Sequence, residues 1–245
     1  MCDLNQGSIS NAKEEGTLHK AGFCSAVLLV LITIITFGMA ICTPPISGPF
    51  STVQGTTYPY TDIISRFPRD YYWMYPAMLL MLIYVFYMLT IDLYASGSKQ
   101  IFSRVSLILT CMSACILTVN YYIQVFVIQT SLINGEFEGI ALLTQYNPHG
   151  LFIAAEEIGY IFMSLSILLL APVFSEHKPI QKAIRWTAVL CFALTLISFI
   201  LISVMYGIER EYRFECAVIA IDWISLILLG IFTGILFRRG MAAGK

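Results

Sequence analysis

Six runs of mainly apolar residues follow one another along the chain, separated by polar or turn-rich segments. They cover residues 22–43, 73–95, 104–130, 149–174, 184–206 and 215–237. A helix needs about 20 mainly apolar residues to cross the hydrocarbon core of a bilayer, and each run is long enough. The pattern predicts an all-α polytopic membrane protein with six transmembrane helices. Little length remains for a soluble domain, so we expect one membrane domain over residues 21–240, with tails at 1–20 and 241–245.

Composition and charge agree with this class and predict an orientation. The sequence is 58% hydrophobic and 12% charged, and its mean hydropathy is +0.78. Only four of the 14 Lys and Arg residues lie in the segments that are outside if the N-terminus is inside: Arg66, Arg69, Arg210 and Arg213. Because positive residues collect on the cytoplasmic side, both termini of the multi-pass protein are predicted to be cytoplasmic. No run of basic residues indicates nucleic-acid binding.

A few strongly polar residues lie deep inside the apolar runs. Glu156 and Glu157 lie in the fourth run, Asp222 in the sixth, and Asn120 with Gln124 in the third. Burying such groups in hydrocarbon is costly, so they usually line a polar cavity or pair with one another. The sequence therefore predicts a membrane protein with a polar interior.

Helical periodicity indicates where these side chains point. In the third run one stripe is polar except for Leu117, and contains Ser106, Thr110, Ser113, Asn120 and Gln124. In the fourth run the lipid-facing side contains Ile158, Ile161, Phe162, Leu165 and Leu169, and the opposite side contains Glu156, Tyr160, Met163 and Ile167. With 3.6 residues per turn, Glu156 is expected to face the bundle centre. Glu157, on the flank with Ser164, is expected at a helix–helix contact.

The polar residues also lie at a similar distance from the expected outer ends of their helices. Asn120, Glu156 and Asp222 are about seven to ten residues from those ends, or roughly 10–15 Å at the rise of an α-helix. We therefore expect one site at one level, formed by Glu156, Glu157, Asp222, Asn120, Gln124 and Tyr160. Burial disfavours a charged carboxylate, so at least one of the acids is expected to hold a proton.

Three functions fit such a site. Three acids with no Lys or Arg at the same depth favour an outward-facing cavity that binds or transports a cation, a proton or a small polar solute. An intramembrane enzyme acting on a lipid or isoprenoid, with the acids as general acid and base, is the alternative, although an enzyme is the less favoured class. The third possibility is a sensor or assembly protein whose acids fasten helices. None of the three histidines lies deep in an apolar run, because His149 is the first residue of the fourth run and His19 and His177 lie outside the runs, so we expect no metal site and no cofactor.

The connecting segments carry further predictions. Segment 44–72 is rich in Pro and Gly, and either gates the site or simply covers helix ends. The sequence Glu209-Arg210-Glu211-Tyr212-Arg213 predicts ion pairs within one tight turn, and Asn147-Pro148 predicts a helix start.

Two further patterns concern contacts between the runs. Cys42 and Cys216 both lie at outer helix ends, which leaves a disulfide between them open. Gly230 and Gly234 have the GxxxG spacing of a close helix–helix contact, expected within one chain.

Three segments resemble those of small uncharacterised prokaryotic multi-span membrane proteins. They are Thr144–Gly150, Glu156–Tyr160 and Tyr206–Glu215. The resemblance implies a prokaryotic cell membrane and no particular activity.

Overall fold

A computed structural model describes the backbone of residues 2–43 and 57–243, and the side chains of 14–43, 57–210 and 212–242. Within these residues all regular structure is helical. Six helical stretches are long and apolar enough to span a membrane: Glu14–Cys42, Arg69–Tyr94, Gly97–Ile133, Leu151–Leu168, Pro179–Glu209 and Tyr212–Ala242. The prediction of an all-α, six-span membrane protein is confirmed.

The spans are built from long helices with short helical pieces between them. The long helices are α1 (Cys2–Cys42), α2 (Met74–Tyr94), α3 (Gln100–Tyr122), α6 (Leu151–Leu168), α7 (Pro179–Tyr206) and α8 (Glu211–Ala243). Helix α3 continues through a π-helical segment, η5 (Ile123–Ile128), into α4 (Gln129–Ile133), and α5 (Ile140–Leu143) follows. Four short 3₁₀ helices complete the set: η2 (Ile63–Arg66), η3 (Arg69–Tyr71), η4 (Gly97–Lys99) and η6 (Gly207–Glu209).

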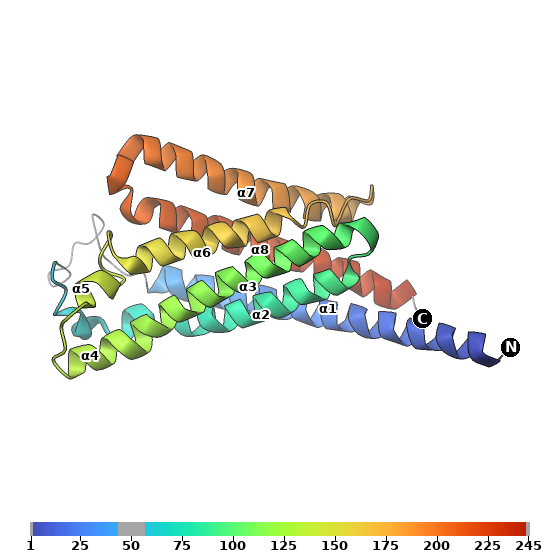
Figure 1. The fold of residues 1–245 in the computed structure, drawn as a ribbon, viewed down its shortest axis with the longest axis horizontal. Helices are drawn as coiled ribbons and strands as arrows, with labels where there is room; N and C mark the ends of the chain where they lie inside the picture. The colour runs from blue at the N-terminus through green and yellow to red at the C-terminus, as the bar shows by residue number, and fades with distance from the viewer. Residues whose placement is uncertain (1, 44–56, 244–245) are drawn as a thin grey trace.

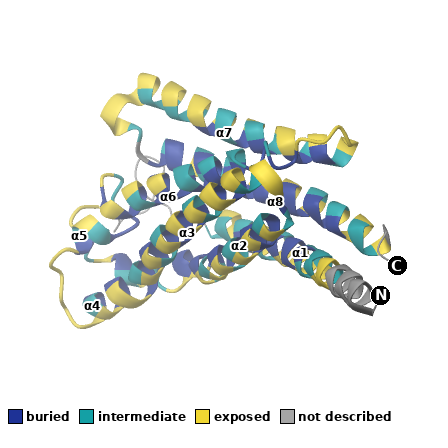
Figure 2. Cartoon of the chain, turned by 45° about the vertical axis from the view of Figure 1, so that its right-hand side comes forward, coloured by how far each residue is buried: buried dark blue, intermediate teal, exposed yellow. Residues whose placement is uncertain are grey.

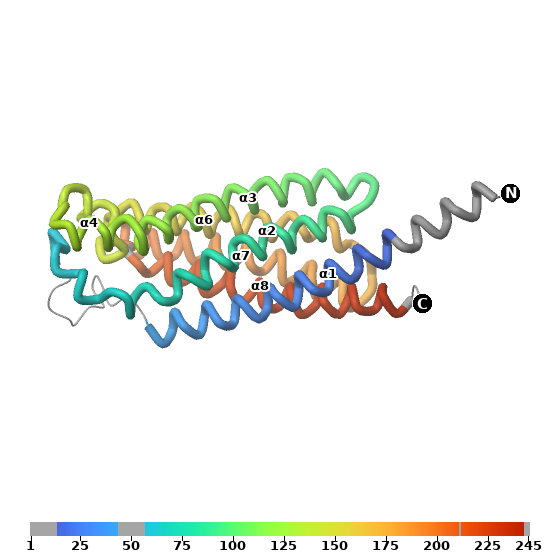
Figure 3. The backbone as a smooth tube through the Cα atoms, turned by 90° about the horizontal axis from the view of Figure 1, so that it is seen from below, coloured from blue at the N-terminus to red at the C-terminus, as the bar shows by residue number. Residues whose placement is uncertain are grey.

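The long helices form a ring in the order α1, α2, α3, α6, α7, α8. Each packs mainly on its neighbours in this order, and α8 closes the ring against α1 (Figures 1 and 3). Helix α6 also contacts α8. This contact brings the buried acids of α6 close to those of α8. Short links join α2 to α3 and α6 to α7, and each of these pairs packs as antiparallel neighbours.

The two ends of the bundle differ in charge. Both termini, η4 and the α6–α7 link lie at one end (Figure 1), here called the basic end. It holds Lys20, Lys99, Arg104, Lys178, Lys182, Arg185, Arg238 and Arg239. The opposite, or loop, end holds η2, η3, α4, α5 and η6 together with Arg66, Arg69, Arg210 and Arg213. The residues divide as the sequence predicts; which end faces the cytoplasm stays a prediction.

The helices bury the faces that the sequence pattern indicated. In α3 and η5 the predicted stripe is buried: Ser106, Thr110, Ser113, Leu117, Asn120 and Gln124. In α6, Glu156, Tyr160, Met163 and Ile167 are buried, whereas Ile158 on the opposite side is exposed (Figure 2). The polar side chains of both helices therefore face the interior of the bundle.

Some boundaries and contacts differ from the sequence predictions. Helix α6 begins at Leu151 after Gly150, because Asn147 Oδ1 accepts a hydrogen bond from the His149 amide (2.9 Å) in a turn before the helix. The predicted start at Asn147-Pro148 is therefore wrong. Cys42 and Cys216 are both free thiols. The Pro- and Gly-rich residues 44–56 lie outside the described residues, as does the side chain of Glu211.

The GxxxG pair forms a close contact inside the chain. A Cβ atom added at Gly230 would lie 2.6 Å from Val30 Cγ2 and 3.1 Å from the Ala26 carbonyl oxygen of α1. At Gly234 it would lie 3.7 Å from Ala26 Cβ, an ordinary contact distance. Gly230 thus sets how closely α8 approaches α1.

Gly230→Ala is expected to be less stable than Gly234→Ala by about 1–3 kcal/mol, because overpacking would push α8 away from α1. Replacing Gly by Ala raises helix propensity equally at both positions, so the difference in stability between the two variants measures the contact with α1 alone. Thermal unfolding in detergent measures it, and equal midpoints for the two variants would contradict the packing argument.

Candidate functional site

Two glutamates face each other across the contact between α6 and α8. The carboxyl of Glu156, on the inner face of α6, lies next to the carboxyl of Glu215, in the second turn of α8, and next to the hydroxyl of Tyr121. Glu156 has no exposed surface and Glu215 is 7% exposed. Three of the four carboxyl oxygens have no hydrogen-bond partner among the described residues: Oε1 and Oε2 of Glu156, and Oε2 of Glu215. The two carboxyl groups are thus buried together, and neither forms an ion pair with a described Lys or Arg side chain.

Glu157 has a different partner. Its Oε2 accepts a hydrogen bond from Arg210 Nη2, in the link between α7 and α8. The guanidinium of Arg210 also lies over the rings of Phe199 (5.0 Å) and Phe214 (5.7 Å). Arg210 therefore pairs with a distant acid rather than within its own turn, and the expectation that no Lys or Arg lies at the depth of the acids is wrong. The ion pairs predicted for Glu211 lie outside the described side chains. Glu157 does lie at a helix contact, as predicted.

A layer of aromatic side chains lies beside Glu156. The hydroxyls of Tyr121 and Tyr160 are 2.9 Å apart. The Trp73 ring is 5.1 Å from Tyr121 and 6.2 Å from Trp223, and the Tyr160 ring is 6.3 Å from Trp223. Both indole Nε1 atoms are buried without an acceptor among the described residues. Tyr160 is therefore part of the site, with Tyr121 as its hydrogen-bond partner.

Asp222 forms a second polar group, where α6, α7 and α8 meet. Its Oδ1 accepts hydrogen bonds from Ser164 Oγ (2.7 Å) and Cys191 Sγ (3.1 Å), and Ser164 Oγ is 2.9 Å from Thr195 Oγ1. Asp222 has no exposed surface, and its Oδ2 has no partner in the described part of the chain. Hydrogen bonds therefore hold Oδ1 of Asp222 in place, whereas Oδ2 has an unused acceptor position among the described residues.

The acids lie at two levels rather than one. Asp222 is bonded to Ser164, which lies eight residues after Glu156 in α6, or roughly 12 Å further from the loop end. Tyr160 lies between the levels, within electrostatic range of both Glu156 and Asp222. The predicted common level is wrong because α8 begins at Glu211, which places Asp222 a turn deeper than its position in the apolar run suggests.

Asn120 and Gln124 are buried as predicted, but they bind backbone groups rather than the acids. Asn120 Nδ2 donates to the Phe152 carbonyl (3.0 Å), and Gln124 Nε2 donates to the Leu143 carbonyl (2.6 Å). Gln124 Oε1 accepts from the Gln145 amide (2.9 Å). Asn120 therefore binds the first turn of α6, and Gln124 binds the end of α5 and the connection that follows it.

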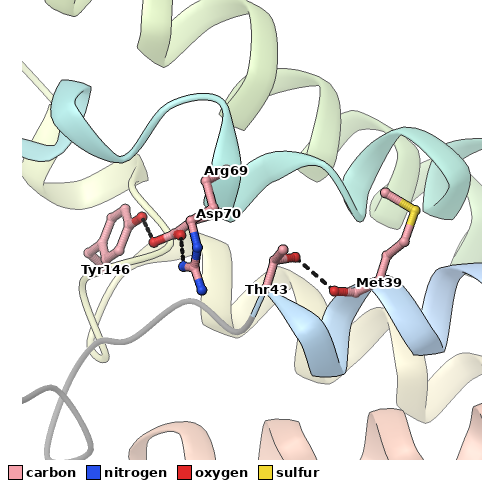
Figure 4. Close-up of polar contacts among 5 residues, drawn as sticks. All are labelled: Met39, Thr43, Arg69, Asp70 and Tyr146. Atoms are coloured by element: carbon pink, nitrogen blue, oxygen red, sulfur yellow. Dashed lines mark hydrogen bonds and ion pairs between the residues drawn. The ribbon is translucent and has the colours of Figure 1, made fainter.

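The segment 57–73 covers the loop end and is fastened by Asp70. Asp70 is fully buried, its Oδ1 accepts from Arg69 Nη1 (2.5 Å), and its Oδ2 accepts from Tyr146 Oη (2.8 Å), as Figure 4 shows. Nearby, at the end of α1, Thr43 Oγ1 donates to the Met39 carbonyl (2.7 Å; Figure 4). Asp70 thus ties the segment 57–73 to the connection between α5 and α6.

Several polar atoms beneath this segment are buried without partners among the described residues. They are Tyr71 Oη, Gln129 Oε1 and both amide heteroatoms of Gln145. Tyr71 lies beside both glutamines and Tyr146. Buried amides and hydroxyls of this kind commonly bind ordered water or a polar ligand. The polar interior therefore continues from the acids toward the loop end.

Tyr146→Phe is expected to lower the free energy of unfolding by about 1–3 kcal/mol, because it removes a hydrogen bond to the buried Asp70 carboxylate. Burial above all, and then Tyr71 and Asp70, raises the pKa of the Tyr146 hydroxyl. The hydroxyl therefore stays a donor below the ordinary tyrosine value of about 10, and its stabilising effect should be lost only at higher pH. Tyr72→Phe, at an exposed ring, is the control; equal thermal midpoints at neutral pH would contradict the contact.

A scan against models of protein families, and searches of curated proteins and of solved structures, found no match to this chain. Its function is therefore argued from its own residues.

Proposed function

We propose that the chain is a membrane transporter for a cation, a proton or a small polar solute, with Glu156 and Glu215 as its proton- or cation-binding pair. The observation that carries the proposal is the pair itself: Glu156 is fully buried beside a second carboxyl, and neither of its oxygens has a hydrogen bond. Two carboxylates so placed repel unless a proton or cation lies between them. A pair that served packing alone would be expected to have its oxygens satisfied.

Polar groups follow one another from the loop end toward the middle of the bundle. After the glutamate pair come the Tyr121 and Tyr160 hydroxyls, and then Asp222 with Ser164. A hydroxyl both donates and accepts, so such a series can pass on a proton. Further along, Tyr84 Oη is 2.5 Å from Ser166 Oγ. This series supports movement of a proton rather than binding at a single point.

The site is closed to solvent in this structure. Glu156, Tyr160 and Asp222 have no exposed surface. Access from the loop end requires displacement of the segment 57–73 or of Arg210 from Glu157. A transporter alternates between closed and open forms, and the outward opening is part of the proposal.

We place the protein in the plasma membrane of a prokaryotic cell, with both termini in the cytoplasm. The support is the concentration of Lys and Arg at the basic end and the position of both termini there (Figure 1). A protease-sensitive tag added at either terminus is expected to resist cleavage from outside intact cells. Cleavage of either tag from outside would reverse the orientation.

Flux through reconstituted vesicles tests the transport proposal. With a pH-sensitive dye inside, and Na⁺ or K⁺ gradients imposed in turn, the wild-type protein is expected to give a flux that responds to voltage or pH. Glu215→Gln should abolish the flux, and Glu138→Gln, at an exposed acid of the loop end, should leave it unchanged. Lipid turnover in detergent that needs no gradient and stops in Glu215→Gln would instead establish an enzyme. If all three proteins give no more flux than empty vesicles, transport is excluded and the acids serve helix packing.

A further inference from the structure

A pocket opens at the basic end, which is the opposite end of the bundle from the Glu156 and Glu215 pair. It has a volume of about 540 Å³ and lies between the beginnings of α3 and α7. Its lining combines two cations, Lys99 and Arg185, two hydroxyls, Ser98 and Ser175, and apolar side chains that include Phe102 and Val189. The volume is in the range of about 300–1,000 Å³ typical of small-molecule sites.

The two cations of this pocket have no partner among the side chains that the structure describes. Among the described residues, the side chains of Lys99 and Arg185 make no ion pair or hydrogen bond. The nearby acid Glu176 is paired with Lys178 (3.1 Å). The pocket is therefore positively charged.

The pocket exists because α6 is shorter than the helices on either side of it. Helix α6 separates α3 from α7 in the ring and ends at Leu168, where turns over residues 169–174 replace it. The two neighbouring helices continue past this level and leave a notch between them. Trp186, 61% exposed, and Ile101, 65% exposed, are the chain neighbours of the lining residues Arg185 and Phe102.

We propose that this notch binds an anionic phospholipid, with the headgroup phosphate between Lys99 and Arg185 and the upper acyl chains against Phe102 and Val189. A free phosphate ion would fill only a small part of the volume and would leave the apolar wall uncovered. Basic pockets between helices at the cytoplasmic face recognise anionic headgroups in this way. The site is independent of the proposed transport, because it lies at the opposite end of the bundle from the glutamate pair.

Lipid binding to the purified, delipidated full chain tests the proposal. Phosphatidylglycerol is expected to bind, by native mass spectrometry, and to raise the thermal midpoint, whereas phosphatidylcholine and glycerol phosphate should do neither. Lys99→Gln/Arg185→Gln should weaken phosphatidylglycerol binding roughly tenfold or more. The matched control Lys182→Gln/Arg239→Gln removes two exposed charges from the same end without touching the pocket. It should bind as the wild type does.

A second variant keeps the charge and fills the notch. Val189→Trp should also weaken phosphatidylglycerol binding, and circular dichroism with gel filtration checks that each variant is folded. Equal binding of phosphatidylcholine, or equal loss in both double variants, would overturn the proposal in favour of general attraction to the basic end. Glycerol phosphate binding as tightly as the lipid would make the site one for a soluble phosphate.

Discussion

Glu156→Gln is expected to leave the bundle folded and to abolish the voltage- or pH-dependent flux. Glutamine has nearly the same shape as a protonated glutamate and carries no charge, so the buried position beside Glu215 tolerates it. The amide cannot release a proton, and it is a much weaker ligand for a cation than a carboxylate. The loss should therefore appear in transport rather than in the thermal midpoint.

Infrared titration in the carboxyl-stretch region measures the same group directly. A band from a protonated carboxyl should be present near neutral pH in the wild-type protein and should be reduced in Glu156→Gln and in Glu215→Gln. Glu138→Gln, at an exposed acid, is the matched control and should leave this band unchanged. The site assignment fails if Glu156→Gln unfolds the protein, or if it transports at the wild-type rate.

Arg210→Gln is expected to produce the largest loss of stability among single substitutions at the loop end. It leaves Glu157 as an unpaired carboxylate whose side chain is only 10% exposed. Breaking a buried pair costs about 3–5 kcal/mol, and because 30% of the Arg210 side chain reaches solvent, we expect roughly 1–3 kcal/mol here. Packing of the guanidinium on Phe199 and Phe214 is lost as well.

A double-mutant cycle separates the ion pair from this packing. Thermal or denaturant unfolding of Glu157→Gln, Arg210→Gln and the double variant gives the coupling energy between the two side chains. The double variant should be more stable than Arg210→Gln alone, because it no longer buries an unpaired charge. If the two effects simply add, the contact between Glu157 and Arg210 does not contribute.

The sequence predicts much of the fold because apolar length and helical period are local properties. The six spans, the polar stripe containing Ser106 and Asn120, and the inward face of Glu156 all follow from spacing along one helix. The relative depth of residues on neighbouring helices is not a local property. It depends on where α6 and α8 begin, and those starts are set by turns such as the one that Asn147 makes.

The partners of the site residues depend on contacts between distant parts of the chain. Arg210 lies 53 residues from Glu157, in a turn that offers it acidic neighbours on both sides. Glu215 stands at the edge of an apolar run, where an acid resembles an ordinary surface residue. The sequence feature that comes closest to identifying Glu215 as a site residue is its spacing from Asp222. The two acids are seven residues, or two helical turns, apart, which places both on one face of α8. This spacing could have assigned Glu215 to the site.

The π-helical segment Ile123–Ile128 has a consequence for insertions and deletions in this chain. Each residue of a helix turns the chain by about 100°, and a π turn accommodates one residue more than an α turn. Deleting one residue there would restore regular α-helical bonding, and because the π turn already holds one extra residue, Gln129 and Leu132 would keep the interior faces that they now occupy. A further residue inserted there would instead turn both side chains about a quarter of a revolution away from the interior and break the bond from Gln129 Nε2 to the Gln124 carbonyl (3.1 Å). This segment is thus expected to tolerate a deletion but not an insertion, whereas a residue added to the exposed 134–139 turn would alter no buried face.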